Sequence, residues 1–275
     1  MKSLMVFLSV IIGFYLLICT LAYFFQEQMI FFPQTLSRDF KFGFSGNFEE
    51  RFVEMDDGKQ LHALLFKAEN SKGVVFYLHG NAGSLEGWGG VSRTFTNIGY
   101  DLFIPDYRGY GKSEGRIKSE AQLHRDMQLL YDHLKEEYRE KEIIVLGHSI
   151  GSGLAARLAA KNKPKLLILQ APFYSVPDIK NNTTPLQILP SFLLRYKLKT
   201  GKYVKETKVP VAVLHGDEDE IIYYGSSLKL QREFKPGDTL VTLKGFGHNN
   251  FLGTHRYDEE IERVLKRFEN PNGTR

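Results

Sequence analysis

The stretch VLGHSIGSG, residues 145–153, places Ser149 between two glycines directly after an apolar run that is typical of a strand. A GxSxG pattern between a strand and a helix is typical of a serine nucleophile, because small flanking residues allow a strained turn that lifts the hydroxyl clear of the backbone. Residues 151–156, GSGLAA, also match the GxGxxA pattern of a loop that binds dinucleotide phosphates. The remainder of the sequence has to distinguish these two interpretations.

Cofactor and metal sites find little support elsewhere in the chain. In a dinucleotide site the first glycine closely follows its strand and an acid ends the next strand, whereas here residues 147–150 intervene and the next apolar run ends at Gln170. A phosphate loop at residues 111–113, GKS, would need glycine where the chain has Asp106. The chain has no HExxH motif and a single cysteine, Cys19, and its formal charge of +4 is spread along its length. We therefore expect no cofactor, no metal and no nucleic acid partner.

Short apolar runs alternate with helical patterns along most of the chain. This alternation predicts an α/β fold with a mostly parallel sheet and helices on both faces, and the Asp57-Gly58 turn predicts an antiparallel hairpin at one edge. Residues 174–208 are too long for an ordinary connection, so we expect a small lid insertion above one end of the sheet. The expected strands are residues 51–55, 61–66, 74–78, 102–105, 143–146, 166–169, 211–214 and 240–243, and the expected helices are residues 86–98, 120–138, 150–160, 226–234 and 256–268.

The first part of the chain differs from the rest, because residues 4–25 contain no charged side chain. As a helix with a rise of about 1.5 Å per residue, such a segment spans the roughly 30 Å hydrocarbon core of a bilayer. A cleaved signal peptide is the alternative, but its apolar region usually has about 7–15 residues. We expect a membrane anchor at residues 1–27 and a catalytic domain at residues 28–275. Lys2 lies closer to the span than the basic residues that follow it, which favours a cytoplasmic N-terminus and a catalytic domain on the non-cytoplasmic side.

A serine nucleophile needs a base, and His248 is the candidate for Ser149. His248 lies in a glycine-flanked loop after the last predicted strand, where a histidine has little packing role. His148 adjoins the nucleophile, so its side chain points elsewhere and cannot serve as the base. His79 and His215 lie at strand ends, and we expect them to be structural.

The orienting acid and the oxyanion donors also come from the ends of predicted strands. Asp217 and Asp219 both follow one strand, and spacing alone leaves either of them open as the acid. The segment HGNAG ends the third strand in a loop whose backbone N–H groups can face a developing oxyanion. Asn81 is the expected donor there, with Ala82 as the alternative, and Ile150 supplies the second N–H group.

Five segments of this chain resemble motifs of the α/β-hydrolases and occur in the same order. The similarity is to the branch that includes monoacylglycerol lipases, serine aminopeptidase-like hydrolases and membrane-anchored palmitoyl-protein thioesterases, and it covers roughly residues 28–270. It implies an eight-stranded sheet whose second strand is antiparallel, and it implies Asp219 as the triad acid. The segments are HGNAGS (79–84), DYRGYGKSEG (106–115), GHSIG (147–151), HGDEDEII (215–222) and GFGHNN (245–250).

The sequence therefore predicts a serine hydrolase that cleaves carboxylic esters or thioesters through a Ser149-His248-Asp219 triad and a covalent acyl-enzyme. Two alternatives remain open: a hydrolase of amides or peptides, and a noncatalytic, membrane-tethered binding protein with the same fold.

The insertion bears on the substrate. Its residues 186–194 are unusually apolar for a surface segment, and the basic run that follows is usually a solvated face. Our hypothesis is that this lid rests on or dips into an anionic bilayer and draws substrate from it. A small acyl substrate, lipid-like in character, and the membrane are therefore the expected partners. The basic run comprises Arg195, Lys197, Lys199, Lys202, Lys205 and Lys208.

Overall fold

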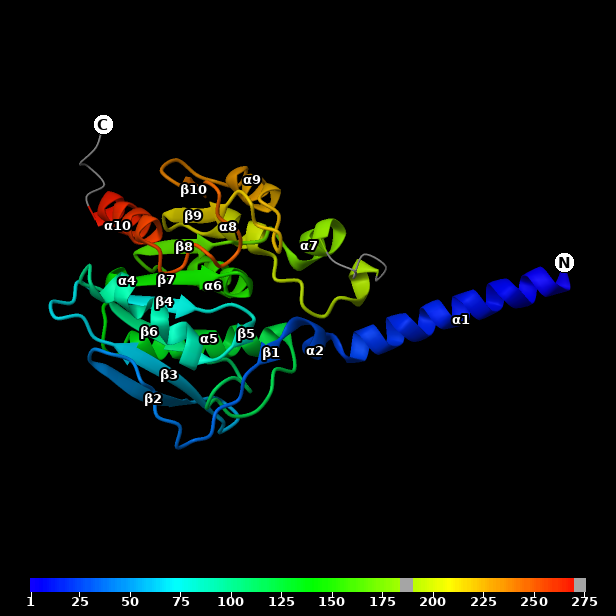
Figure 1. Cartoon of the computed structure of the whole chain (residues 1–275), viewed down its shortest axis with the longest axis horizontal. Helices are drawn as coiled ribbons and strands as arrows, with labels where there is room; N and C mark the ends of the chain where they lie inside the picture. The colour runs from blue at the N-terminus through cyan, green and yellow to red at the C-terminus, as the bar shows by residue number, and fades with distance from the viewer. Residues whose placement is uncertain (184–189, 270–275) are drawn as a thin grey trace.

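The structure of the chain is a computed structural model that describes residues 1–183 and 190–269 (Figure 1). Within these residues the main sheet has eight strands in the order β10-β9-β8-β7-β4-β6-β3-β2. Its strands are β2 (Phe48–Glu54), β3 (Gln60–Phe66), β4 (Val74–Leu78), β6 (Asp101–Pro105), β7 (Ile143–His148), β8 (Leu166–Gln170), β9 (Val211–Gly216) and β10 (Thr239–Leu243). The run from β10 to β6 is parallel, whereas β3 is antiparallel to both β6 and β2. The mostly parallel sheet with a reversed second strand is therefore confirmed.

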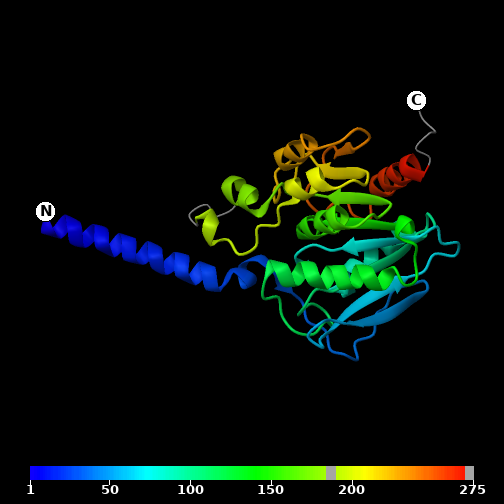
Figure 2. The ribbon, with the colours of Figure 1, turned by 180° about the vertical axis from the view of Figure 1, so that it is seen from behind.

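Helices cover both faces of this sheet (Figures 1 and 2). Side chains of α5, α6 and α8 form one core with the sheet, and side chains of α4 and α10 form the other. In β7, Val145 belongs to the first core and Leu146 to the second, which is why this strand is apolar at successive positions. The helices are α3 (Leu85–Trp88), α4 (Ser92–Thr96), α5 (Glu120–Leu134), α6 (Ile150–Lys161), α7 (Val176–Thr183), α8 (Thr200–Glu206), α9 (Gly225–Gln231) and α10 (His255–Glu269), with single 3-10 turns η1 (Gly89–Val91), η2 (Glu140–Glu142) and η4 (Ser191–Leu193).

One expected helix, residues 86–98, is wrong as a single element. The structure divides it into α3, η1 and α4, because three glycines between positions 87 and 90 lower the helix propensity in its first half. The expected helix at 120–138 is shorter, since α5 ends at Leu134. Its start is as predicted, because Ser119 Oγ accepts from the Gln122 N–H group at 3.1 Å. The Gln122 side chain accepts from the Lys118 N–H group at 2.8 Å and so fixes the residue before the cap.

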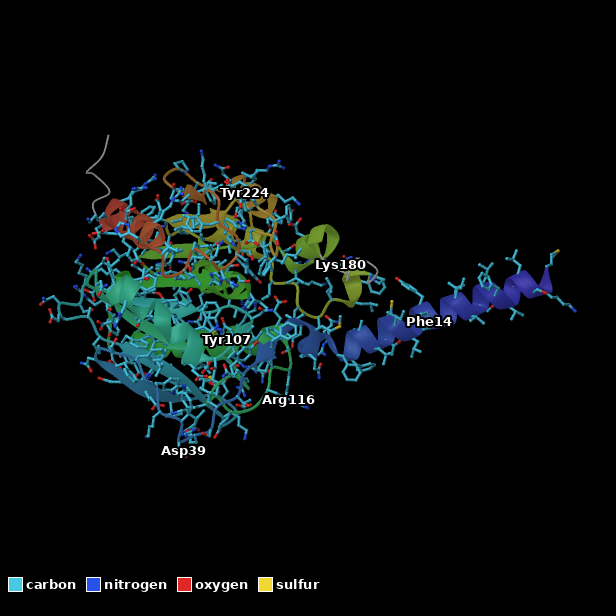
Figure 3. All side chains as sticks on the ribbon, in the orientation of Figure 1. Phe14, Asp39, Tyr107, Arg116, Lys180 and Tyr224 are labelled. Atoms are coloured by element: carbon cyan, nitrogen blue, oxygen red, sulfur yellow. The ribbon has the colours of Figure 1, made fainter. Side chains whose placement is uncertain are left out.

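The chain begins with α1 (Lys2–Phe24), a helix of 23 residues that projects from the body (Figure 1). Among the described residues α1 is the one helix long and apolar enough to cross a membrane. Figure 3 shows the Phe14 side chain on this helix, clear of the domain. Near its end α1 does contact the body, where buried Cys19 packs against Leu194. We treat α1 as a candidate membrane anchor.

The insertion between β8 and β9 contains α7, η4 and α8, and α7 lies on the side of the body from which α1 projects (Figure 1). Of the expected apolar lid segment, residues 186–189 lie outside the described part of the chain. In the remainder, Phe192 is 78% exposed whereas Leu194 is 3% exposed. Arg195 forms an ion pair with Glu27 at 2.9 Å while 30% of its side chain stays exposed, so this residue of the basic run joins the insertion to the segment that follows α1.

Candidate active site

Ser149 lies on the sharp turn between β7 and α6. Its backbone has φ 51° and ψ −118°, a conformation that L-residues rarely adopt. A Cβ atom at Gly147 would lie within 3.0 Å of the Gly151 carbonyl oxygen, and one at Gly151 would lie within 3.0 Å of the Leu78 carbonyl oxygen. Real Cβ atoms do not approach that closely, so both glycines are needed for the turn to pack against β4 and α6. The result places the Ser149 side chain at the carboxyl end of β7.

His248 connects Ser149 to a carboxylate. Its Nε2 atom lies 2.9 Å from Ser149 Oγ, and its Nδ1 atom lies 2.7 Å from Asp219 Oδ2. Because an ionised carboxylate only accepts hydrogen bonds, Nδ1 carries the hydrogen of a neutral imidazole and Nε2 can accept a proton. This arrangement can deprotonate the serine hydroxyl during an attack on a carbonyl group.

Asp219 is held by four donors. Oδ2 accepts from His248 Nδ1 and from His215 Nε2, at 2.7 and 3.0 Å, and Oδ1 accepts from the N–H groups of Ile221 and Ile222, both at 2.8 Å. Burial alone would raise the pKa of Asp219, but the hydrogen bonds from His215 and His248 outweigh it, so the pKa lies well below its usual range. Asp219 therefore stays ionised at neutral pH and can stabilise an imidazolium.

The structure also distinguishes Asp217 from Asp219, the two carboxylates that spacing alone left open as the acid. Asp217 is exposed, and its Oδ1 atom accepts from the Gly245 N–H group at 2.7 Å. Within the described residues no histidine forms a hydrogen bond with Asp217, whereas Asp219 binds His248. The acid that the family resemblance implies is thus the one that lies beside the imidazole.

His215 is buried beneath the site and holds the acid. Because both partners of its Nε2 atom, Asp219 Oδ2 and the Ile222 carbonyl oxygen, are acceptors, Nε2 carries the hydrogen and Nδ1 accepts from the Ser227 hydroxyl at 2.6 Å. The sequence predicts a structural histidine at this position, but nothing in the spacing indicates that it binds Asp219. The nearest signal is that the two residues are four positions apart in the HGDEDEII segment.

His148 points away from Ser149, as expected, and holds the loop that carries His248. Its Nε2 atom lies 2.9 Å from Asn249 Oδ1. Burial, followed by repulsion from His248, lowers the pKa of His148 to about 3. His148 is therefore neutral at physiological pH and fixes the residue next to His248.

The expected oxyanion donors lie at neighbouring strand ends. Leu78 of β4 pairs with Gly147 of β7, and Asn81 and Ile150 lie the same number of residues beyond the two members of this pair. In the described part of the chain neither the Asn81 N–H group nor the Ile150 N–H group has a hydrogen-bond acceptor. Ala82, the alternative, belongs to β5 (Ala82–Gly83), which pairs with β1 (Phe32–Pro33). Two free N–H groups at adjoining strand ends provide what an oxyanion site requires.

The described residues were also compared with the side-chain clusters that bind metal ions. Across residues 1–183 and 190–269, no three His, Cys, Asp or Glu side chains gather in a way that could hold a metal ion. His79, expected to be structural, is buried with its Nδ1 atom 2.7 Å from the Gly80 carbonyl oxygen.

Several known proteins are similar to this chain. The family model described as serine aminopeptidase, S33, matches residues 69–203. The alpha/beta hydrolase domain-containing protein 17B of Xenopus tropicalis is 32% identical over 214 residues, which cover 72% of this chain and 67% of that protein. The lysophosphatidylserine lipase ABHD12 of Danio rerio is 28% identical over 182 residues, covering 59% of this chain and 47% of the lipase. Protein bem46 of Schizosaccharomyces pombe is 34% identical over 168 residues, which cover 58% of this chain and 56% of that protein.

Among solved structures, the esterase Pf2001 of Pyrococcus furiosus superposes with a TM-score of 0.69 at 17% identity, covering 87% of this chain and 98% of the esterase. At this identity the likeness concerns the fold. The chain spans about half the length of the lipase and bem46 relatives. The motifs, the sheet order and the 17B relative agree, and the chain belongs to the α/β-hydrolase family of serine hydrolases.

Proposed function

We propose that this chain is a membrane-anchored serine hydrolase that cleaves carboxylic esters or thioesters of acyl lipids. The observation that carries the proposal is the His248 imidazole, which lies 2.9 Å from the Ser149 hydroxyl and 2.7 Å from the Asp219 carboxylate. A binding protein of the same fold would need neither contact, because binding does not require a serine to be paired with a base and an acid.

The proposed reaction proceeds in two similar halves. His248 Nε2 removes the proton from Ser149 Oγ as this oxygen attacks the carbonyl carbon, and the N–H groups of Asn81 and Ile150 donate to the oxyanion. His248 then gives its proton to the departing alcohol or thiol, which leaves an acyl-enzyme. In the second half His248 deprotonates a water molecule that attacks the acyl-enzyme, and it returns the proton to Ser149 as the carboxylic acid departs. Asp219 remains ionised throughout and stabilises the imidazolium.

The membrane-facing side of the molecule supports an acyl lipid as substrate. Phe192 in η4 and Phe32 in β1 are 78% and 53% exposed, and both elements adjoin the end of the anchor: the Gln26 side chain donates to the Leu193 carbonyl oxygen of η4 at 2.7 Å, and β1 follows shortly after Gln26 in the chain. Exposed apolar side chains at the base of a membrane anchor can enter the lipid interface, where a long acyl chain is available. Relatives named lysophosphatidylserine lipases are named for a lipid ester, which agrees with this choice.

The catalytic domain is proposed to lie on the non-cytoplasmic side of the membrane. The support is the position of Lys2 next to the span, which favours a cytoplasmic N-terminus. Protease added outside sealed cells or inside-out vesicles distinguishes the two orientations, because it digests the domain only on the side where it is exposed.

The nucleophile is tested by covalent labelling with a fluorophosphonate probe in detergent micelles. Wild type is expected to be labelled and Ser149→Ala is not, whereas Ser152→Ala, a matched change at a buried serine of α6, is expected to keep its labelling. Equal labelling of wild type and Ser149→Ala would refute the proposed nucleophile. A chain-length series of esters, thioesters and amides with the same acyl groups then separates the substrate classes, and faster cleavage of the amides would favour the peptidase alternative.

The membrane-facing role of the insertion is tested with Phe192. Phe192→Ser is expected to lower the rate on a lipid ester embedded in anionic vesicles and to leave the rate on a soluble short ester unchanged, because the side chain is exposed and distant in sequence from the reacting groups. The matched control is Phe192→Leu, which keeps an apolar side chain and is expected to behave like wild type. Equal vesicle rates for the serine and leucine variants would argue against contact with lipid.

A further inference from the structure

The chain that follows the anchor runs directly along the loop that carries Asn81. We call residues 30–34 the strap. The Phe32 N–H group donates to the Asn81 carbonyl oxygen and the Gln34 N–H group donates to the Gly83 carbonyl oxygen, both at 2.9 Å. These bonds form the parallel ladder of β1 and β5, in which Phe32 lies opposite Ala82, and Figure 1 shows the two strands together at the base of α2 (Gln26–Ile30).

The strap also binds the side chain of Asn81. Asn81 Nδ2 donates to the Ile30 carbonyl oxygen at 2.9 Å. From the other side, the Tyr110 hydroxyl donates to the Asn81 carbonyl oxygen at 2.7 Å. The side chain and the carbonyl oxygen of Asn81 are therefore both engaged, and its N–H group is the backbone donor that remains for an oxyanion.

The strap is itself fixed at both ends. The Gln34 side chain accepts from Ser84 Oγ at 3.1 Å and donates to Glu86 Oε2 at 2.7 Å, which attaches it to the far end of the same loop. Phe31, which is 5% exposed, packs edge-to-face against Tyr196 of the insertion, with ring centroids 5.3 Å apart. The strap thus joins the anchor, the loop and the insertion.

The loop needs such support because its own sequence is flexible. The segment HGNAGS contains two glycines, and Gly83 has φ +89°, a conformation that is accessible to glycine at no steric cost. A glycine-rich loop loses much conformational freedom when it becomes ordered, so hydrogen bonds from outside the loop decide which backbone conformation it holds.

We infer that the strap is a positioning element of the oxyanion site: by binding Asn81 it holds the loop in the conformation that presents the Asn81 N–H group to the reacting oxygen. The segment that leaves the membrane is then required for turnover as well as for location. This inference rests on the proposed function, since it assigns a role within the same site.

The sharpest test removes one hydrogen bond of the strap and keeps the chain at full length. Phe32→Pro deletes the N–H group that binds Asn81, and Phe31, with φ −112° and ψ 127°, already has the extended backbone required before proline. Phe32→Ala is the matched control, because it removes the same side chain and keeps the N–H group. Both are assayed in detergent micelles with a soluble short-chain ester, so that delivery from a membrane does not limit the rate.

The expected result is a kcat for Phe32→Pro about 10- to 100-fold below that of Phe32→Ala, less than the roughly 10²–10³-fold cost of losing an oxyanion donor completely. KM should change little. A trifluoromethyl ketone, which forms a tetrahedral oxyanion adduct with the serine, should lose affinity for Phe32→Pro by a similar factor. A merely structural role would not reduce kcat and adduct affinity together at an unchanged KM.

A second variant covers the case in which Phe32→Pro fails to fold. Asn81→Ala removes the side-chain bond to Ile30 and keeps the Asn81 N–H group, and it is compared with Gln28→Ala at an exposed position of α2. Asn81→Ala should show the same joint loss of kcat and adduct affinity, and Gln28→Ala should show none. Parallel behaviour of each variant and its control would overturn the inference. Absence of Ser149-dependent hydrolysis in wild type would instead mean that the proposed function itself is wrong.

Discussion

The Nε2 atom of His215 lies 3.0 Å from Asp219 Oδ2, the same oxygen that accepts from His248. Asp219 therefore donates to neither imidazole and must be ionised to satisfy both. In Asp219→Asn the amide NH2 group takes the place of one carboxylate oxygen: at Oδ2 it leaves both imidazoles without their acceptor, and at Oδ1 it faces the N–H groups of Ile221 and Ile222. The neutral amide also provides no charge to stabilise an imidazolium, and the His248 tautomer that leaves Nε2 free is no longer favoured. We expect kcat to fall by about 10³–10⁴-fold with a small change in KM, measured by steady-state ester hydrolysis.

The matched control for this change is Asp217→Asn. Asp217 follows the same strand but is exposed and binds the Gly245 N–H group. We expect its kcat to stay within a few-fold of wild type. Equal losses in the two variants would contradict the assignment of Asp219 as the proposed triad acid.

The turn at Ser149 predicts that Gly151 tolerates no side chain. A Cβ atom in Gly151→Ala would lie within 3.0 Å of the backbone carbonyl oxygens of Leu78 and His79, and backbone cannot move aside as a flexible side chain can. Overpacking of this kind typically costs about 1–3 kcal/mol. We expect a lower thermal unfolding midpoint together with loss of fluorophosphonate labelling.

Gly90→Ala provides the comparison for Gly151→Ala. A Cβ atom at Gly90 meets no heavy atom within 4 Å, and its φ lies outside the positive range. Its unfolding midpoint and labelling should match those of wild type. If Gly151→Ala behaves in the same way, the close contact between the turn and β4 is not a constraint on this fold.

Much of the sheet could be predicted from the sequence because its strands are apolar on both faces. The strand expected at 74–78 has the same bounds as β4, because helices cover both faces of this strand and no polar residue interrupts its apolar run. The ladder of β1 and β5 could not be predicted, because two strands of two residues each have no periodicity. The helix expected at 86–98 is wrong as one element, because helical spacing of apolar residues does not offset the low helix propensity of its three glycines.

The candidate site was predictable in its residue types but not in its contacts. Motif order indicates Ser149 and His248, but the choice between Asp217 and Asp219 depends on a turn in which Asp219 Oδ1 accepts the N–H groups of the residues two and three positions later. Such a turn is local geometry that spacing does not specify. Spacing does not specify the bond from His215 to Asp219 for the same reason.

The buried side chain of Arg108 predicts a stability defect outside the site. Its guanidinium binds Asp126 of α5, with Nε 2.7 Å from Oδ2, and it also binds Asp57 in the β2–β3 turn at 2.8 Å. Arg108→Ala leaves the Asp126 carboxylate buried without its partner, which should cost about 3 kcal/mol, the lower end of the range for breaking a buried pair. For a domain of this size the thermal midpoint should fall by about 6–12 °C at neutral pH.

Two comparisons check the origin of that loss. Burial already raises the pKa of Asp126 while Arg108 lowers it, so removal of Arg108 favours protonation and the deficit should shrink as the pH falls. Arg125→Ala breaks a pair with Asp56 in which the side chains are 61% and 58% exposed, and we expect a change within about 0.5 kcal/mol. A pH-independent deficit at Arg108 would indicate lost packing instead of an unpaired carboxylate.

The neutral, buried His148 predicts how stability depends on pH. Burial lowers the pKa of His148 from 6.5 to about 3, so between these values the unfolded chain binds a proton that the folded chain does not. Folding stability should therefore decrease as the pH falls through this window, by up to about 1.4 kcal/mol per pH unit for one such group. Burial lowers the pKa of His79 and of His124 as well, which acts in the same direction.

Asp219 affects a different part of the pH range. The pKa of Asp219 is lowered in the folded state. Its contribution to folding stability is therefore complete above the unfolded pKa of 3.8 and is lost only in stronger acid. Between about pH 5 and 6.5 the Asp219 contribution to folding stability is thus nearly constant, and the contribution of His148 is measured as the difference between a variant without this histidine and wild type. In His148→Gln one titrating group is absent, and the thermal midpoint should fall less steeply with decreasing pH over this range. His255→Gln, at a side chain that is 88% exposed, should keep the wild-type slope. Parallel curves for His148→Gln and wild type would mean that His148 gains its proton before the chain unfolds, which is incompatible with its burial beside His248.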